Sequence, residues 1–187
     1  MKPFAIYLIL LGFAFRADGQ TNHSPSGPMY VNHIYYYLPD SLTALEQNTA
    51  RMESKTKALG FGGSEGGFIM DGEKSTVRLK SGDTIRFAVK IAMAMADPSM
   101  MIRLYKFDSK KGSRLAILSS QGSAYSKGKK SGNTNEIPFN VQKETDDFIL
   151  IPASRLVPGE YGFLNMMMMN ASGGKSMSFT VFAFGVD

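Results

Sequence analysis

In the middle of the chain every second residue is apolar, and most of the residues between are polar. Between residues 84 and 91 the apolar members fall on one side of an extended backbone: Ile85, Phe87, Val89 and Ile91. A period of two is that of a β-strand with one buried face, because successive side chains point to opposite faces. Val77 and Leu79 alternate in the same way. The intervening turn residues, 81–83, predict that these two strands form a hairpin.

Further strands are predicted wherever β-branched and aromatic residues gather between turn residues. These segments are 29–38, 100–107, 114–119, 137–141, 148–152, 161–169 and 177–186. Residues 42–57 are ambiguous, and we expect a short strand followed by an irregular or briefly helical piece. Pro158-Gly159 has the chemistry of a type II turn. Roughly nine or ten short strands predict an all-β fold, an antiparallel β-sandwich of the Ig-like or jelly-roll-like kind.

The first residues predict export. Lys2 precedes an apolar run, residues 3–15, and the small residues Ala17 and Gly19 fit a signal-peptidase site with cleavage before Gln20. The run is shorter than the ~20 residues that a membrane-spanning helix needs, and no later segment is longer. We therefore expect a signal peptide at 1–19, a flexible leader at 20–28, and a single domain at 29–187. The predicted location is periplasmic or extracellular.

The chain has no cysteine, which excludes thiol chemistry, disulfide bonds and a cysteine-linked lipid anchor. Hydrophobic residues make up 43% and charged residues 20%, which is typical of a folded domain rather than a disordered chain. The net charge of +5 is a mild excess. It favours acidic partners without specifying one.

Basic residues gather between positions 106 and 130, where serine and glycine surround them. The candidate ligand-binding set is Lys110, Lys111, Arg114, Lys127, Lys129 and Lys130. Such a surface would attract an acidic polysaccharide or another anionic envelope component. Nucleic acid is not expected, because Tyr125 is the only aromatic residue inside this segment and single-stranded ligands need stacking platforms.

Methionine is unusually frequent, with 13 residues. Thioethers suit Cu(I) and Ag(I), and the pairs that alternation brings to one face are Met93 with Met95 and Met166 with Met168. Methionine is also a flexible filler of hydrophobic cores, and this chain has no tryptophan to fill large gaps. A methionine-based metal-binding protein is therefore an alternative function.

Catalytic patterns are weak. Only His33 lies in a predicted strand, since His23 falls in the leader, and the acids densest in sequence are Glu144, Asp146 and Asp147. The glycine-rich stretch 60–67 lacks the Lys-Ser/Thr pair and the helix of a phosphate-binding loop. We expect no enzyme activity and no cofactor, with a hydrolase built from scattered carboxylates as a second alternative.

Several segments together carry a resemblance to a known family. They are 72–79, 97–107, 137–141, 156–163 and 182–187, of which the Pro158-Gly159-Glu160-Tyr161 turn is the most recognisable. The chain resembles a family of uncharacterised secreted β-sandwich proteins from Bacteroidetes and other bacteria. The resemblance implies export and a β-sandwich, and it transfers no activity. The function expected is that of a non-catalytic binding or structural module at the cell envelope.

Overall fold

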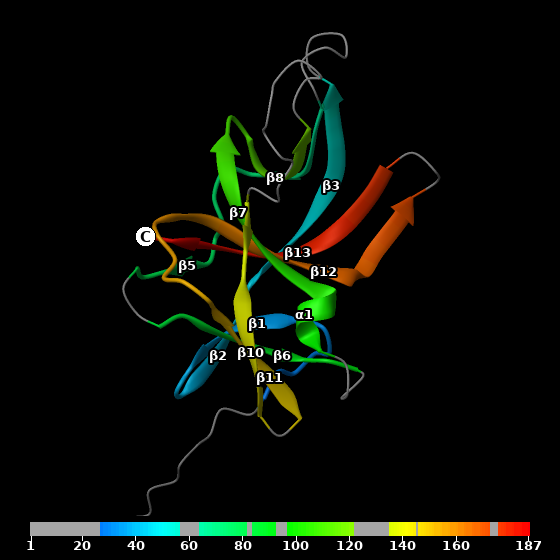
Figure 1. Cartoon of the computed structure of the whole chain (residues 1–187). Coiled ribbons are helices and arrows are strands. Elements are labelled where there is room, and N and C mark those ends of the chain that lie inside the picture. Colours follow the sequence, from blue (N-terminus) through cyan, green and yellow to red (C-terminus); the bar gives the residue numbers. More distant parts are fainter. Residues whose placement is uncertain are drawn as a thin grey trace, which may run out of the picture.

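The computed structural model describes residues 27–56, 64–81, 84–92, 97–121, 135–144, 146–172 and 176–187. Within these ranges the chain is almost entirely β-structure, with antiparallel sheets and one short helix, α1 (Pro98–Met101) (Figure 1). The strands are β1 (Ile34–Leu38), β2 (Ser41–Ala44), β3 (Glu46–Thr56), β4 (Ser64–Asp71), β5 (Arg78–Leu79), β6 (Arg86–Lys90), β7 (Ile102–Lys110), β8 (Ser113–Gln121), β9 (Glu136–Ile137), β10 (Phe139–Glu144), β11 (Asp147–Pro152), β12 (Gly159–Ser172) and β13 (Ser176–Val186).

The larger sheet closes into a six-stranded barrel. Its strands follow the order β12-β13-β3-β4-β8-β7, and β7 returns to pair with β12, with Phe163 opposite Leu104. Closure leaves no free edge among these six strands. Two short strands attach outside this ring: β9 pairs with β7, and β5 runs parallel to β13.

The smaller sheet has five antiparallel strands in the order β10-β11-β6-β1-β2. Its inner face packs against the barrel wall formed by β12, β13 and β7. The Phe87 ring lies 4.8 Å from the rings of both Phe163 and Phe184, measured between centroids. These edge-to-face and tilted aromatic contacts add to the burial of apolar area that joins the two sheets.

Strand β13 carries side chains into two separate cores. Phe182 and Phe184 pack between the barrel and the smaller sheet. Phe179, Val181 and Ala183 alternate with them and fill the inside of the barrel. Because both faces are buried, the strand is apolar at nearly every position rather than at every second one.

The predicted all-β, antiparallel fold is confirmed. The larger sheet closes on itself, so a two-layer sandwich does not describe the whole arrangement. The predicted hairpin of residues 77–79 with 84–91 is wrong: β5 pairs with β13, whereas β6 pairs with β1 and β11. Residues 41–56 form strands β2 and β3 without a helical piece, because β3 is paired along its length by β4 and β13.

The start of the segment predicted as a strand at 100–107 is helical instead. Asp97 caps α1 by accepting a hydrogen bond from the Ser99 amide, and Pro98 occupies a first-turn position that suits its fixed φ angle. No helix in the described part of the chain is long and apolar enough to cross a membrane. The predicted signal peptide, and all but the last residues of the predicted leader, lie outside the described residues.

The barrel interior is tight at Gly162, which suggests a test of its packing. A Cβ atom at this position would lie 2.6 Å from Cγ1 of Val181 and 3.1 Å from Cε2 of Phe107. We expect Gly162→Ala to lower the free energy of unfolding by about 1–3 kcal/mol through overpacking. Val181→Ala in the same chain should recover part of that loss by making room. Urea unfolding of both single variants and the double variant measures the coupling, and strict additivity would contradict the proposed clash.

Candidate functional site

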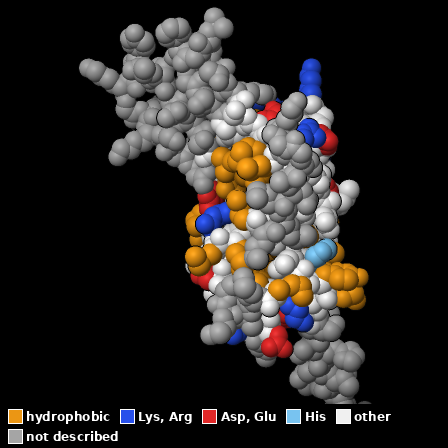
Figure 2. All heavy atoms as spheres, turned by 90° about the vertical axis from the view of Figure 1, so that its right-hand side faces the viewer, with side chains coloured by type: hydrophobic (Ala, Val, Ile, Leu, Met, Phe, Trp, Pro, Cys, Tyr) orange, Lys and Arg blue, Asp and Glu red, His pale blue; other side chains and the backbone are white. Residues whose placement is uncertain are grey.

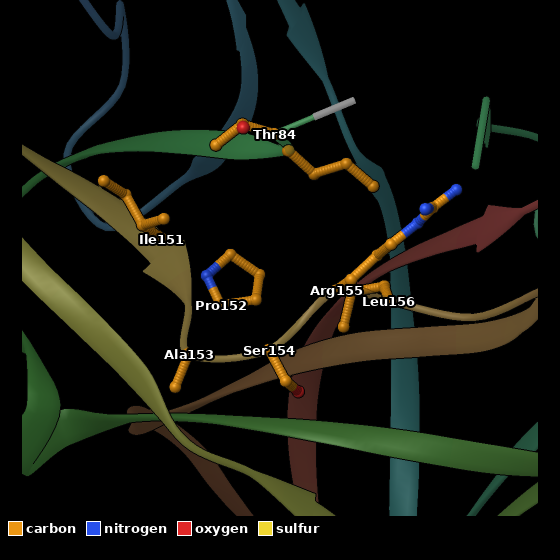
Figure 3. A pocket seen from close by; sticks show the side chains of 8 residues that line it. Thr84, Ile151, Pro152, Ala153, Ser154, Arg155 and Leu156 are labelled. Atoms are coloured by element: carbon orange, nitrogen blue, oxygen red, sulfur yellow. The ribbon is translucent and has the colours of Figure 1, made fainter. Parts of the chain in front are cut away.

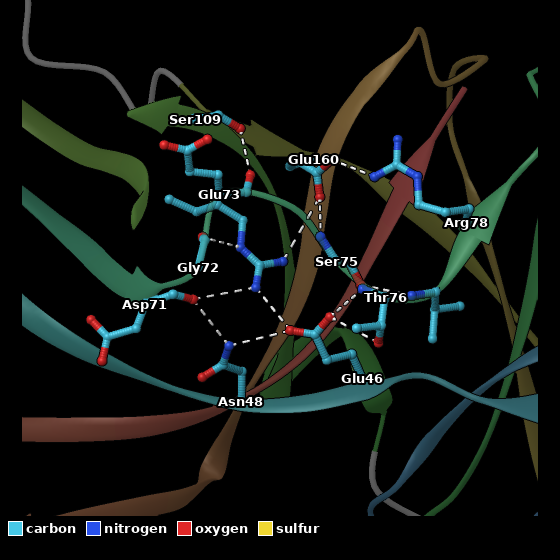
Figure 4. Close-up of polar contacts among 12 residues, drawn as sticks. Glu46, Asn48, Asp71, Gly72, Glu73, Ser75, Thr76, Arg78, Ser109 and Glu160 are labelled. Atoms are coloured by element: carbon cyan, nitrogen blue, oxygen red, sulfur yellow. Dashed lines mark hydrogen bonds and ion pairs between the residues drawn. The ribbon is translucent and has the colours of Figure 1, made fainter. Parts of the chain in front are cut away.

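A buried arginine, Arg114, hydrogen-bonds polar groups where β3 begins and β4 ends, at one end of the barrel. Figure 4 shows the neighbouring Glu46, Asp71, Gly72 and Glu160. Arg114 on β8 is 1% exposed. Its Nη2 donates to Oε1 of Glu46 on β3 at 2.8 Å, and its Nε donates to the Gly72 carbonyl at 3.0 Å. Gly72 has a φ of +83°, a backbone conformation that favours glycine. The strand pairing of β3, β4 and β8 thus brings an arginine and a glutamate together that lie 68 positions apart in sequence.

A second glutamate and a second arginine extend this cluster. Glu160 on β12 accepts a hydrogen bond from the Ser75 amide at 2.8 Å, and its Oε2 lies 3.8 Å from Nη1 of Arg114. That Nη1 has no hydrogen-bond partner among the described residues. Arg78 pairs with Glu160 and also with Asp187, the last residue of the chain. We call these five residues, Glu46, Arg78, Arg114, Glu160 and Asp187, the arginine cluster.

The charges of the arginine cluster stabilise one another. Burial raises the pKa of Glu46, but hydrogen bonds from Arg114, Ser75 and Thr76 and the charge of Arg114 outweigh it and lower this pKa from 4.5 to about 2. The hydrogen bond to Asp187 is the largest cause of a raised pKa at Arg78. Glu46 is therefore held ionised by Arg114, and Glu160 is bound by Arg78. This arrangement fixes β3, β8, β12 and the chain end together.

The predicted basic surface is only partly described. Lys110 and Lys111 are exposed at the turn between β7 and β8. Arg114 is buried in the arginine cluster, so it does not face a surface ligand. The candidate positions Lys127, Lys129 and Lys130 lie outside the described residues. Of the predicted set, the structure therefore shows two exposed lysines, which are neighbours in sequence, and one arginine that is buried in an ion-pair cluster.

The predicted methionine pairs lie largely outside the described residues, so they stay a prediction. Met93 and Met95 lie outside them. Met166 on β12 is 44% exposed, and of its predicted partner Met168 only the backbone is described, also in β12. No group of three or more His, Cys, Asp or Glu side chains in the described ranges could hold a metal ion.

A half-open cavity lies where β11 ends beside the start of β6 (Figure 3). Its volume is about 270 Å³, and its lining residues are Thr84, Ile85, Ile151, Pro152, Ala153, Ser154, Arg155 and Leu156. Ile85 and Leu156 belong to the core between the sheets and give the cavity an apolar floor. Figure 3 shows the hydroxyl groups of Thr84 and Ser154 on different sides of the space. We call this space the Arg155 cavity.

The Arg155 cavity has one lining cation, and no described acid neutralises it. Arg155 is exposed, and no ion pair joins it to another described residue. A guanidinium group with an open donor fork and two nearby hydroxyls matches an anionic, oxygen-rich ligand.

A second cavity, of about 260 Å³, surrounds His33 and is mostly apolar. The His33 ring lies 5.4 Å from the Tyr30 ring and 5.3 Å from the Phe182 ring. Figure 2 shows this histidine beside a group of exposed hydrophobic side chains, which includes Met29 and Tyr30. No hydrogen bond orients the imidazole toward a described side chain, so the contacts of His33 are those of a packing residue.

The acids singled out from the sequence form a hairpin end rather than a facing pair. Glu144 and Asp147 are register partners on β10 and β11. Burial raises the pKa of Asp147, Lys90 opposes that rise, and the charges of Asp146 and Glu144 add to it. Its Oδ1 is buried without a hydrogen-bond partner among the described residues. The surroundings of this carboxyl therefore disfavour its ionised form.

No sequence pattern indicated Arg155 or the two glutamates of the arginine cluster as site residues. Glu46 begins a polar segment and Glu160 follows a turn 114 positions later, so no spacing connects them. Arg155 lies in a loop without a motif, and only the fold brings it beside Thr84.

Replacing Arg114 by methionine should be strongly destabilising. It leaves Glu46 without its counter-charge, while Glu160 keeps Arg78, and breaking a buried ion pair in this way typically costs about 3–5 kcal/mol. Lys111→Met, on the exposed turn nearby, should change stability by less than about 0.5 kcal/mol. Chemical denaturation at pH 7 measures both. Equal stability of the two variants would show that the cluster is not a structural lock.

The pH dependence of stability tests Glu46 separately. Its pKa is lowered on folding, so its contribution is full above pH 4.5 and is lost as the pH falls toward about 2. Glu46→Gln should therefore cost roughly 2–3 kcal/mol at pH 7 and much less near pH 2. Urea denaturation across this range measures the difference. A cost that does not change with pH would contradict the assignment.

Asp147→Asn should act in the opposite direction. The pKa of Asp147 is raised above 3.8 on folding, so the proton that stabilises the folded state is lost as the pH rises through the folded value. The amide mimics the protonated form, and this variant should be more stable than the parent at pH 7 but not below pH 3.8. Asp108→Asn, at an exposed position, is the control. Destabilisation of Asp147→Asn at pH 7 would refute this.

No family model, curated protein or solved structure matches this chain. The resemblance to secreted Bacteroidetes β-sandwich proteins therefore stays a prediction from the sequence. The roles of the Arg155 cavity, the arginine cluster and the His33 cavity are inferred from the chemistry of their residues.

Proposed function

We propose that this chain is an exported, non-catalytic binding module of the cell envelope that takes an acidic saccharide at the Arg155 cavity. The observation that carries the proposal is an exposed arginine, without an ion pair to the described residues, on the rim of a half-open cavity. Thr84 and Ser154 line the same space with hydroxyl groups. Export follows from the predicted signal peptide, and the site is argued from the fold.

The lining chemistry favours a saccharide over a purely apolar ligand. Sugar rings present hydroxyls at their edges and C–H groups on their faces. Thr84 and Ser154 can exchange hydrogen bonds with the edge, while Ile85, Ile151 and Pro152 can cover a face. The guanidinium of Arg155 selects a carboxylate or sulfate substituent, because it can bind such a group with two parallel hydrogen bonds. A volume of about 270 Å³ is at the small end for ligand sites and suits one sugar unit of a chain.

The cavity of the proposed module is built on the core that joins the two sheets. The wall formed by β12, β13 and β7 packs against the smaller sheet and also belongs to the barrel. Ile85 and Leu156 tie the cavity floor to that shared core. A preformed site loses less entropy on binding than a mobile loop does.

Two other functions have less support from the geometry. A hydrolase needs a carboxylate free to take or give a proton, and Glu46 and Glu160 are both bound by arginine. A basic surface at Lys110 and Lys111 remains an alternative binding site for the same class of acidic polymer. It differs from the Arg155 cavity because exposed lysines bind without a defined pocket.

Titration with a galacturonic acid trisaccharide, followed by calorimetry, tests the proposal. We expect saturable binding that Arg155→Gln weakens by at least about tenfold, since a lost charge-assisted hydrogen bond contributes roughly 1.5–3 kcal/mol. The affinity of the parent for the neutral galactose trisaccharide should be no higher than the affinity of Arg155→Gln for the acidic trisaccharide. The double variant Lys110→Gln/Lys111→Gln, which removes more charge on the exposed turn, should bind like the parent.

Two results would overturn this assignment. Absence of heat with both trisaccharides would remove the saccharide as ligand. A loss of affinity in the double lysine variant, with Arg155→Gln unaffected, would move the site to the turn between β7 and β8.

A further inference from the structure

Two exposed methionines lie at the end of the barrel away from the arginine cluster. Strand β3 runs from Glu46, in the cluster, to Met52 and beyond, and β13 runs from Met177 to the cluster at its other end. Met52 is 44% exposed and Met177 is 51% exposed. Together with Met166 on β12, which is 44% exposed, we call them the methionine end.

Met52 and Met177 are the next residues on β3 and β13 after the last pair of the ladder between these strands. Arg51 pairs with Ser178, and Ala50 pairs with Phe179. The two methionines therefore leave neighbouring strands at the same level, where long, flexible thioether side chains can turn toward each other. Side chains two positions apart share a face of a strand, so Met52 is on the face of Ala50 and Met177 is on the face of Phe179. Ala50 and Phe179 belong to the barrel core.

These methionines do not fill the core. Met70 on β4 does so and is 0% exposed, whereas Met52 and Met177 leave about half of their surface in solvent. The barrel core below them is already closed by Phe68 and Phe179, whose ring centroids are 5.0 Å apart. Packing therefore accounts for Met70 and leaves the exposed pair unexplained.

A third thioether comes from the adjoining strand. Met166 follows Asn165, which pairs with Thr180 on β13. The register of β12 and β13 then shifts between Asn165 and Met169, so the chain is irregular where Met166 leaves the ladder. The three exposed methionines thus belong to three consecutive strands of the barrel, β12, β13 and β3.

We propose that the methionine end binds a soft monovalent cation, Cu(I) or Ag(I), through the thioethers of Met52 and Met177, with Met166 as a third ligand. Soft sulfur ligands select these ions over harder divalent cations. Met166 belongs to a pair expected from sequence spacing, whereas Met52 and Met177 do not, because only the pairing of β3 with β13 brings their strands together. This site is independent of the Arg155 cavity and of any saccharide bound there.

Calorimetric titration of the purified chain with silver nitrate in a chloride-free buffer tests this site. We expect one equivalent of Ag(I) to bind, and Met52→Leu/Met177→Leu to weaken the affinity by at least about tenfold. Leucine keeps the volume and apolar character of each side chain, so folding is preserved. Met100→Leu changes a 76% exposed methionine on α1 and should bind Ag(I) like the parent.

A second readout identifies the ligand atoms. X-ray absorption of the silver-loaded chain should show sulfur neighbours that diminish in the double leucine variant. Met166→Leu should also weaken binding, and an unchanged affinity would remove Met166 from the site. Absence of saturable binding by the parent, or equal affinity of the parent and the double variant, would overturn the proposal.

Discussion

Burial of β12 and β13 on both faces is the constraint on which the rest of the structure depends. Phe182 and Phe184 face the smaller sheet while Val181 and Ala183 face the barrel interior, so one strand belongs to two cores at once. Removing either core would expose a row of large apolar side chains to water. The barrel and the smaller sheet are therefore energetically coupled through a shared wall rather than joined by a linker.

This shared wall makes close packing a requirement at its glycines. Gly185 allows Arg78 to approach, since a Cβ atom there would overlap the guanidinium, and the arginine cluster can then join β5, β12 and the chain end. The cluster replaces hydration of buried charges with mutual hydrogen bonds. The cluster lies at the end of the barrel and links strands that are far apart in sequence. Its role is to hold these strands in register.

Binding chemistry is left to the surface because the interior groups are already engaged. Arg114 and Arg155 show the contrast: the first is buried between two glutamates, and the second stands at a cavity with no described acid beside it. The same contrast separates Met70, inside the barrel, from Met52 and Met177 at its rim. In both cases the residue type alone does not separate the buried, structural side chain from the one for which we propose binding, and the two differ in exposure.

Alternation at Ile85, Phe87 and Val89, together with the other short β-branched and aromatic segments between turns, was enough to predict an all-β, antiparallel fold, because these patterns are local properties of the chain. Barrel closure, the partner of β5 and the pairing of Arg114 with Glu46 were not readable, because they join residues far apart whose contacts leave no short-range pattern. Strands that are buried on both faces, such as β13, also lack the alternation that would show which of their faces is buried. The tertiary structure alone decided which arginines and methionines face solvent, since exposure depends on which strands cover one another.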